Sequence, residues 1–301
     1  MVRALIAGGS GFIGKHLSKK IIDGGGEVAI LTRKADQSIS YKQITWNPTG
    51  DEGIQAKEID GYDVVINLAG AGIDKKWTEP YKKEIVDSRV RSTSLLVNAI
   101  NSANSKPKYL VSASAIGYYG NVEEGTVDED SKAGDDFLAN LSTRWEEEAK
   151  KVDKSVKLLT PRFGVILGND GGAFPQLLRG ARSGISFNTK GRASWKSWIH
   201  VDDAVSSIIF MTQGGFEGAY NAVSPNQLRL DGLMNLIAGE MGKKIRIRMG
   251  PSIAKLMLGE GSEYSVFSGQ RVVPRRLLEM GFKFKYPDIQ EALNDLMARS
   301  N

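Results

Sequence analysis

The chain has 301 residues, of which 41% are hydrophobic and 25% charged, a composition that excludes a disordered protein or a collagen-like repeat. Its 40 lysines and arginines exceed its 35 aspartates and glutamates by only five charges, spread along the chain, so we expect no nucleic acid partner. No apolar run approaches the ~18 residues of a membrane helix, and we expect neither a membrane partner nor a secretory signal.

The chain contains no cysteine and only two histidines, His16 and His200. Disulfides, thiol catalysis and cysteine-ligated metals are therefore excluded, and too few histidines are present for a histidine-rich metal cluster. We expect no metal site. The lack of cysteine is consistent with a reducing, cytoplasmic location.

Short apolar runs alternate with helical patterns over roughly the first 165 residues. Strands are predicted at residues 2–7, 27–32, 63–68, 109–112 and 156–162. Helices are predicted at residues 12–23, from 79 to about 102, and from near 135 to 152. This order predicts an α/β fold with a doubly wound, mostly parallel sheet of the Rossmann type.

Beyond Gly168 the chain becomes rich in glycine and loses this regular alternation. We expect a Rossmann domain at residues 1–168, rejoined by about 197–225, where a strand leads into a helix capped by Asp202. The remaining segments are predicted to form a smaller C-terminal α/β lobe for substrate, with two helices; the segments are 169–196 and 226–301, and the helices 231–241 and 288–298.

Three glycines, Gly8, Gly11 and Gly14, stand between the first predicted strand and the first predicted helix. Glycine at this spacing permits a tight turn and lets the backbone approach a pyrophosphate, while the helix start offers unpaired N–H groups, here around Phe12 and Ile13. A tight strand-to-helix turn without a ligand is the alternative. The placement of the motif favours a dinucleotide site.

The end of the second strand reads Leu31-Thr32-Arg33-Lys34 and carries no carboxylate for a ribose 2′-hydroxyl. Arg33 lies about where a guanidinium would pair with a 2′-phosphate, so the sequence favours NADP(H) as cofactor. A solvated basic pair is the alternative. Asp36 is close enough to keep an NAD-type contact open.

Several segments carry a resemblance to a known family. They are GGSGFIG (8–14), NLAG (67–70), SASAIGYYG (112–120), WIHVDD (198–203) and GQRVVPRRLLEMGF (269–282). Over its whole length the chain resembles the extended short-chain dehydrogenases/reductases. It is most similar to an atypical group labelled only as epimerase family proteins, with an NAD-dependent epimerase/dehydratase domain and a C-terminal domain of unknown function. The resemblance places Leu68, Ala69 and Gly70 at the cofactor.

In that family a tyrosinate within a Tyr-x-x-x-Lys pair removes a hydroxyl proton while a hydride moves to the nicotinamide. None of the nine tyrosines here has a lysine four residues later, and the family positions of the pair fall on Leu138 and Ser142. The asparagine that completes the family's proton relay is replaced by Arg89. Ordinary epimerase chemistry is therefore not expected.

The remaining candidates for catalysis are Ser114, Tyr118, Tyr119 and Arg89. Ser114 occupies the position of the family's catalytic serine or threonine, and the two phenols follow it. A phenol could donate a proton to a carbonyl oxygen while Arg89 or Ser114 holds the oxyanion. Loop packing by the rings, and turn capping by the serine, remain open as alternatives.

Other candidates have structural alternatives at least as strong. Lys76, Trp77 and Arg89 would approach the nicotinamide, with a core tryptophan and a solvated helix cation as the alternatives. His200 would be an acid/base or a structural residue. Trp195 and Trp198 would stack on substrate or fill the core, and Gln270, Arg271, Arg275 and Arg276 would contact an anionic substrate or form an exposed basic face.

The sequence thus predicts an NADP(H)-dependent oxidoreductase acting on an unknown small carbonyl or sugar-like molecule, as a monomer or homodimer. The alternative is a non-catalytic regulator in which NADP(H) occupancy shapes a partner surface, and the missing Tyr/Lys pair is the feature that raises it. The fold alone does not decide between them.

Overall fold

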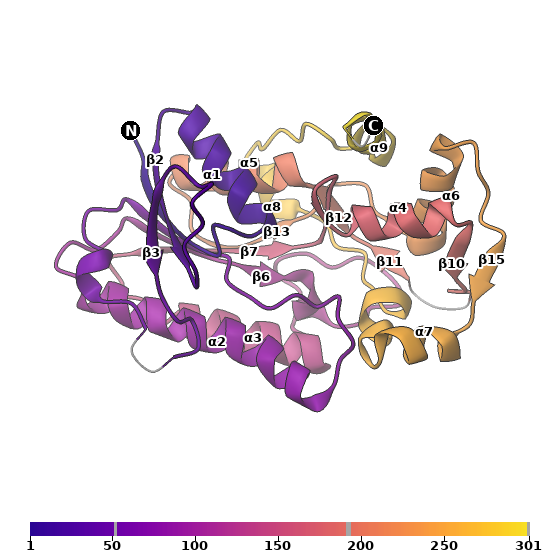
Figure 1. Ribbon diagram of the computed structural model, residues 1–301, viewed down its shortest axis with the longest axis horizontal. Helices are drawn as coiled ribbons and strands as arrows, with labels where there is room; N and C mark the ends of the chain where they lie inside the picture. Colours follow the sequence, from indigo (N-terminus) through magenta and orange to yellow (C-terminus); the bar gives the residue numbers. More distant parts are fainter. Residues whose placement is uncertain (51–52, 191–193, 300–301) are drawn as a thin grey trace.

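The computed structural model describes residues 1–50, 53–190 and 194–299. Its centre is an eight-stranded sheet in the order β13-β7-β5-β4-β1-β2-β3, with β6 also beside β7, and all these pairs are parallel (Figure 1). The strands are β1 (Arg3–Ala7), β2 (Glu27–Thr32), β3 (Lys42–Thr45), β4 (Val64–Asn67), β5 (Tyr109–Ser112), β6 (Ser114–Ala115), β7 (Lys157–Phe163) and β13 (Gly218–Ala222). The predicted doubly wound α/β fold is confirmed.

Helices cover both faces of this sheet, which is why β1 and β2 contain runs of successive apolar residues rather than alternating ones. The paired helices α1 (Phe12–Asp23) and α5 (Val201–Gln213) lie on one face, and α2 (Glu79–Ser102) and α3 (Phe137–Ala149) lie on the other (Figure 1). Within β1, Ala4 and Ile6 join the α1/α5 core, whereas Leu5 and Ala7 join the α2 core. Sequence reasoning missed β3, an edge strand whose KQIT segment has no apolar run.

The other elements form smaller sheets and the helices around them. The strands are β8 (Val165–Gly168), β9 (Gly171–Gly172) and β12 (Trp198–His200) in one sheet, β10 (Ile185–Phe187) with β15 (Ile247–Met249), and β11 (Trp195–Lys196) with β14 (Leu228–Arg229). The helices are α4 (Phe174–Arg182), α6 (Leu230–Glu240), α7 (Pro251–Leu258), α8 (Arg275–Glu279) and α9 (Ile289–Ala298), with short turns η1 (Ala56–Glu58), η2 (Ile116–Tyr119) and η3 (Glu263–Phe267). β12 pairs with β8 rather than with the central sheet, to which α5 and β13 return.

A second hydrophobic core lies among these smaller elements, with Phe174, Trp198, Leu233, Phe267 and Leu293 all buried. Trp198 is fully buried and its indole N–H donates to the Asn226 carbonyl at 2.7 Å, so it is a core residue. No helix in the described ranges is long and apolar enough to cross a membrane. Within the same ranges, no three or more of His, Asp and Glu gather as a metal site would require.

The cap of α5 differs from the prediction. Asp202 was expected to cap this helix, but His200 has the extended backbone of an N-cap, and its Nδ1 accepts the Asp202 N–H at 3.1 Å. Asp202 already lies in the first turn. Asp203 instead accepts the backbone N–H groups of Lys285 (2.8 Å) and Tyr286 (2.9 Å), and so ties the C-terminal segment to α5.

The His200 side chain is fully buried between α5 and α9. Its Nε2 lies 3.3 Å from Asp295 Oδ2, and the Tyr286 hydroxyl donates to the other oxygen of Asp295 at 2.8 Å. Burial nevertheless dominates and lowers the pKa of His200 to about 4, against the attraction of nearby carboxylates. His200 is therefore a neutral structural residue at neutral pH.

This arrangement predicts a loss of stability in mild acid. Because the unfolded chain takes up a proton near pH 6.5 and the folded chain only near pH 4, the free energy of unfolding should fall across that interval by up to about 3 kcal/mol. Urea unfolding at several pH values measures this fall. His200→Asn, which keeps a cap acceptor but cannot titrate, should flatten the curve.

The other histidine is the matched control, because His16 lies on α1 beside the exposed Asp170. His16→Gln should leave the fall between pH 6.5 and 4 in place. An equally steep fall in the His200→Asn variant would contradict the assignment.

Candidate functional site

The strand order reverses direction between β1 and β4. From β1 the chain proceeds outward to β2 and β3, and then crosses to β4, β5 and β7 on the other side. In open parallel sheets, ligands bind outside the carboxyl ends of the strands at such a point. The ends of β1 and β4 are in register at Ala7 and Asn67, so the glycine loop and residues 68–70 start side by side.

The glycine loop is shaped by close contacts. Gly8 has a φ of +76°, and a Cβ there would lie 2.8 Å from the Leu68 carbonyl carbon. A Cβ on Gly14 would lie 2.3 Å from the Gly8 oxygen, so only glycine lets α1 approach the loop this closely. The structure thus brings Gly8 and Gly14 together with Leu68.

The start of α1 is open to an anion. Gly11 is the extended N-cap and has no side chain to cap the helix, and the helical bonding begins with Lys15 N–H to Gly11 O at 2.9 Å. The backbone N–H groups around Phe12 and Ile13 and the positive end of the helix dipole therefore fit a pyrophosphate.

The Phe12 side chain has a different role from its backbone. A Cβ on Gly168 or on Gly171 would lie 2.4 Å from the Phe12 ring, so the ring rests on the turn between β8 and β9. His16 Nε2 contacts both carboxylate oxygens of Asp170 in the same turn, each at 3.0 Å. These contacts explain part of the glycine richness after residue 168.

Arg33 and Asp36 differ in their partners. Arg33 is exposed just past the end of β2, and its side chain has no ion-pair or hydrogen-bond partner in the described part of the chain. Asp36 accepts the N–H and hydroxyl of Ser38 at 2.9 and 2.7 Å, which lowers the pKa of its carboxyl. The carboxylate is therefore engaged in its own turn, whereas the guanidinium is available.

Ser114 belongs to a buried polar network at the carboxyl ends of β5 and β7. The Arg162 guanidinium donates to both oxygens of Glu146, with Nε–Oε1 at 2.8 Å and Nη2–Oε2 at 2.9 Å. The Ser114 hydroxyl donates to Glu146 Oε1 at 2.8 Å. With its proton engaged in this way, Ser114 can accept from a ligand hydroxyl but does not donate to an oxyanion.

The two adjacent tyrosines of η2 are in different environments. The Tyr119 side chain is buried; its hydroxyl donates to Asn221 Oδ1 at 2.7 Å and accepts from Arg162 Nη1 at 3.0 Å. Burial raises the pKa of Tyr119 to about 12. Tyr118 is half-buried, its ring lies 3.5 Å from the Arg162 guanidinium carbon, and no described residue bonds its hydroxyl.

Arg89, on α2, is a largely buried cation beside the loop after β4. It donates to the carbonyls of Ile85 (3.1 Å) and Ala71 (3.0 Å) and lies over the Trp145 ring. A Cβ on Gly70 would lie 3.1 Å from its guanidinium carbon. Burial lowers the pKa of Arg89 to about 10, and no carboxylate in the described ranges forms an ion pair with it.

A buried threonine holds the start of this loop. The Thr93 hydroxyl accepts from Asn67 Nδ2 at 2.8 Å and from the Trp145 indole at 2.9 Å, and donates to the Arg89 carbonyl. Asn67 Oδ1 in turn accepts the Ala69 N–H at 3.1 Å. Leu68, Ala69 and Gly70 are thus positioned by side chains of the strand and helices around them.

The positions of the missing Tyr/Lys pair are packed. Leu138 and Ser142 lie on α3, where a Cβ on Gly117 of η2 would be 3.1 Å from Leu138 Cβ and 3.8 Å from Ser142 Oγ. η2 therefore packs closely on the helix face that carries the pair in the wider family.

Trp77 is buried and stacks on Tyr264, with ring centroids 5.2 Å apart, and its indole N–H donates to the Ile73 carbonyl. Lys76 is exposed. Trp77 therefore links the loop after β4 to the C-terminal segment.

Arg275 and Arg276 are both paired with Asp130.

Sequence reasoning missed Lys196. Its side chain is buried and donates to the Ser268 carbonyl at 3.0 Å, and burial lowers its pKa to about 8. Next to it in sequence is Trp195, whose ring centroid lies 5.3 Å from the guanidinium carbon of Arg229 and 5.2 Å from that of Arg271. The described residues provide no carboxylate ion pair for these three cations.

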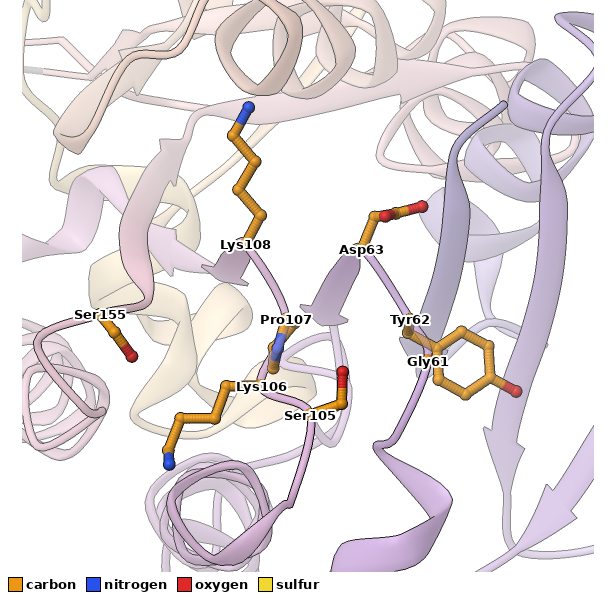
Figure 2. A pocket seen from close by; sticks show the side chains of 8 residues that line it. All are labelled: Gly61, Tyr62, Asp63, Ser105, Lys106, Pro107, Lys108 and Ser155. Atoms are coloured by element: carbon orange, nitrogen blue, oxygen red, sulfur yellow. The ribbon is translucent and has the colours of Figure 1, made fainter.

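A shallow pocket of about 370 Å³ lies at the amino-terminal ends of the central strands, opposite the ends that carry the glycine loop (Figure 2). It is lined by residues that precede β4, β5 and β7, among them Asp63, Lys106 and Ser155. Because this is the amino-terminal edge of the strands, the pocket is remote from the glycine loop and we do not assign the cofactor to it.

Comparison with known proteins places the chain among related sequences. The family model described as NAD dependent epimerase/dehydratase family matches residues 4–222, and one described as a domain of unknown function (DUF1731) matches residues 252–296. The chain is 36% identical over 298 residues to "Epimerase family protein SDR39U1 homolog, chloroplastic" of Arabidopsis thaliana, covering 97% of this chain and 86% of that protein.

It is also 30% identical over 302 residues to the human epimerase family protein SDR39U1, covering 99% of this chain and 100% of the human protein. The crystal structure of human SDR39U1 (isoform 2) with NADPH is similar to this fold, with a TM-score of 0.88 and 29% identity over 99% of each chain.

Because Glu146 is paired with Arg162, substitutions of Glu146 and of its neighbour Glu147 should have very different effects on the free energy of unfolding. Glu146→Gln leaves the Arg162 charge buried without its counter-ion and should lower the free energy of unfolding by about 3–5 kcal/mol. Glu147→Gln, at the exposed next position, should change it by no more than about 0.5 kcal/mol. Urea unfolding near pH 7 measures both, and equal small changes would contradict a buried ion pair.

Proposed function

This chain belongs to the NAD dependent epimerase/dehydratase family, and on that premise we propose that it is an NADP(H)-dependent oxidoreductase of a small carbonyl or sugar-like substrate. The observation that carries the proposal is the start of α1, which has no side-chain cap and lies at the switch point. Beyond the neighbouring strand, Arg33 has no ion-pair partner among the described residues. The similar human protein crystallised with NADPH supports this choice of cofactor.

Each group of proposed cofactor residues contacts a different part of NADP(H). Gly8, Gly11 and Gly14 let the backbone approach the pyrophosphate, whose charge the N–H groups of Phe12 and Ile13 receive. Arg33 pairs with the 2′-phosphate. An NAD-type site would have a carboxylate side chain in place of this arginine. Leu68, Ala69 and Gly70 line the cofactor from the end of β4.

When bound, NADPH supplies a hydride to the carbonyl carbon. Tyr118 donates its hydroxyl proton to the carbonyl oxygen, and the product is an alcohol. The geometry favours Tyr118 over Tyr119, because the Tyr119 proton is already donated to Asn221. Arg89, which donates two of its five N–H groups to backbone carbonyls within the described chain, stabilises the charge that develops on the oxygen.

Ser114 orients the substrate as an acceptor, because its proton is donated to Glu146. We assign cofactor binding to residues 1–168 with about 197–225, and substrate binding to 169–196 and 226–301. In the latter, the guanidinium groups of Arg229 and Arg271 beside Trp195, together with the buried Lys196, favour a substrate with a carboxylate or phosphate group.

One observation favours a second candidate function. η2 packs on the α3 face that bears the Tyr/Lys pair in the wider family, so a bound cofactor there would lack the usual acid/base partner. The chain would then be a regulator whose NADP(H) occupancy sets the shape of a partner surface.

The cofactor assignment predicts that replacing Arg33 lowers the affinity for NADPH but not for NADH. Arg33→Asp should weaken NADPH by about tenfold to a hundredfold, equivalent to about 1.5–3 kcal/mol, and leave NADH nearly unchanged. Energy transfer from the five tryptophans to the reduced nicotinamide measures both affinities. Lys57→Asp, an equal charge change at an exposed site, is the control, and equal weakening of both cofactors by Arg33→Asp would reject the 2′-phosphate role.

The assignment of the proton donor predicts different effects for the two tyrosines. With a panel of aldehydes and ketones bearing a carboxylate or phosphate, Tyr118→Phe should lower kcat by about 100-fold or more. Tyr119→Phe should mainly lower stability, by about 1–3 kcal/mol, because Arg162 and Asn221 lose a partner.

Consumption of NADPH, followed by absorbance, measures turnover. Full activity in the Tyr118→Phe variant would show that another group donates the proton. NADPH binding without turnover of any carbonyl in the panel would favour the regulator.

A further inference from the structure

Helix α7 (Pro251–Leu258) presents apolar side chains to solvent instead of to the core. Ile253, Leu256 and Met257 are 47%, 75% and 56% exposed, and their spacing of three and four residues places them on one face of the helix. Of the α7 side chains that the structure describes, only Ala254 is buried.

Exposed cations lie in the chain before this helix and within it. The segment 241–258 contains five basic residues and no Asp or Glu; they are Lys243, Lys244, Arg246, Arg248 and Lys255, all exposed. None of them forms an ion pair with a described carboxylate: Lys243 donates to the Arg182 carbonyl and Arg248 to the Asn235 amide oxygen. Ile247, on β15 between them, is 56% exposed.

The surface formed by residues 243–257, here termed the β15–α7 face, lies at one end of the molecule (Figure 1). β15 pairs with β10 at this end, and α7 follows directly, whereas β3 and α1 lie toward the other end. The face therefore lies away from α1 and from the glycine loop at its start. It belongs to residues 226–301, to which we assign substrate binding, but a lipid-binding role does not rest on that assignment.

We propose that the β15–α7 face docks onto an anionic phospholipid surface. Exposed apolar side chains on a short helix, flanked by unpaired lysines and arginines, are the features of a segment that lies in the interface of a charged bilayer without spanning it. The hydropathy of the chain led us to expect no membrane partner, but the length of apolar runs reports on spanning helices and not on surface docking.

Charge decides among the possible occupants. A second copy meeting this face with its own would bring two sets of unpaired cations together, which like-charge repulsion opposes. A neutral bilayer would leave the cations without partners. Phosphate groups of anionic lipids provide a counter-charge, while the acyl region receives Ile253, Leu256 and Met257.

Cosedimentation of the full chain with vesicles tests the proposal. One set of vesicles is pure phosphatidylcholine and the other contains about one third phosphatidylglycerol, at salt concentrations from about 0.05 to 0.5 M. The chain should bind only the anionic vesicles, and less at high salt. The double substitutions L256S/M257S and K243Q/K244Q should each lower the bound fraction by about tenfold.

The matched controls change the same residue types elsewhere. Leu278→Ser replaces a 49% exposed leucine on α8, and K57Q/K132Q removes two exposed lysines; both variants should bind like the parent chain. Circular dichroism and NADPH titration establish that each variant is folded.

Several results would overturn the proposal. They are no binding to anionic vesicles at low salt, equal binding to neutral vesicles, unchanged binding by both patch variants, and a dimer that L256S/M257S converts to monomer without any vesicle binding. Binding of polyglutamate in place of vesicles, lost in the patch variants, would likewise overturn it and identify an acidic protein as the partner.

Discussion

The buried ion pair between Arg162 and Glu146 is the interaction on which the centre of the molecule depends. Removing both charges from water carries a large cost, which is offset only when the geometry is good and the remaining donors are used. Here the guanidinium meets the carboxylate through two bonds, and its third edge donates to Tyr119. β7, α3 and η2 are thereby held in one arrangement, and the ends of β5 and β7 acquire a defined polar surface.

The alternation of strands and helices in the first half was predictable because the central sheet is buried on both faces. Such strands contain runs of successive apolar residues, and each parallel pair needs a crossover, usually a helix, to return the chain. β3 could not be predicted in this way, because an edge strand needs no apolar run. The N-cap of α5 was predicted wrongly for another reason. Asp202 is a better capping residue by type, but the chain becomes helical at Val201, so His200 is the N-cap.

The surroundings of the proposed cofactor site could be predicted further than those of the proposed catalytic residues. The glycines, Arg33 and residues 68–70 all follow strand ends, so their positions follow from the order of the elements. The difference between Tyr118 and Tyr119 arises from partners 43 and 102 positions away, Arg162 and Asn221, which no local pattern identifies. Lys196 gave no signal either, because its burial comes from the distant segment around Ser268.

The contact between Phe12 and the β8–β9 turn has a consequence for the evolution of this chain. The Phe12 ring, at the first residue of α1, fills the space that side chains on Gly168 and Gly171 would need. Any substitution that adds a methyl group at either glycine therefore requires a smaller residue at position 12, and a smaller residue there leaves a void unless the turn is refilled. The three positions can diverge only together, so covariation among homologues should connect residue 12 to residues more than 150 positions downstream.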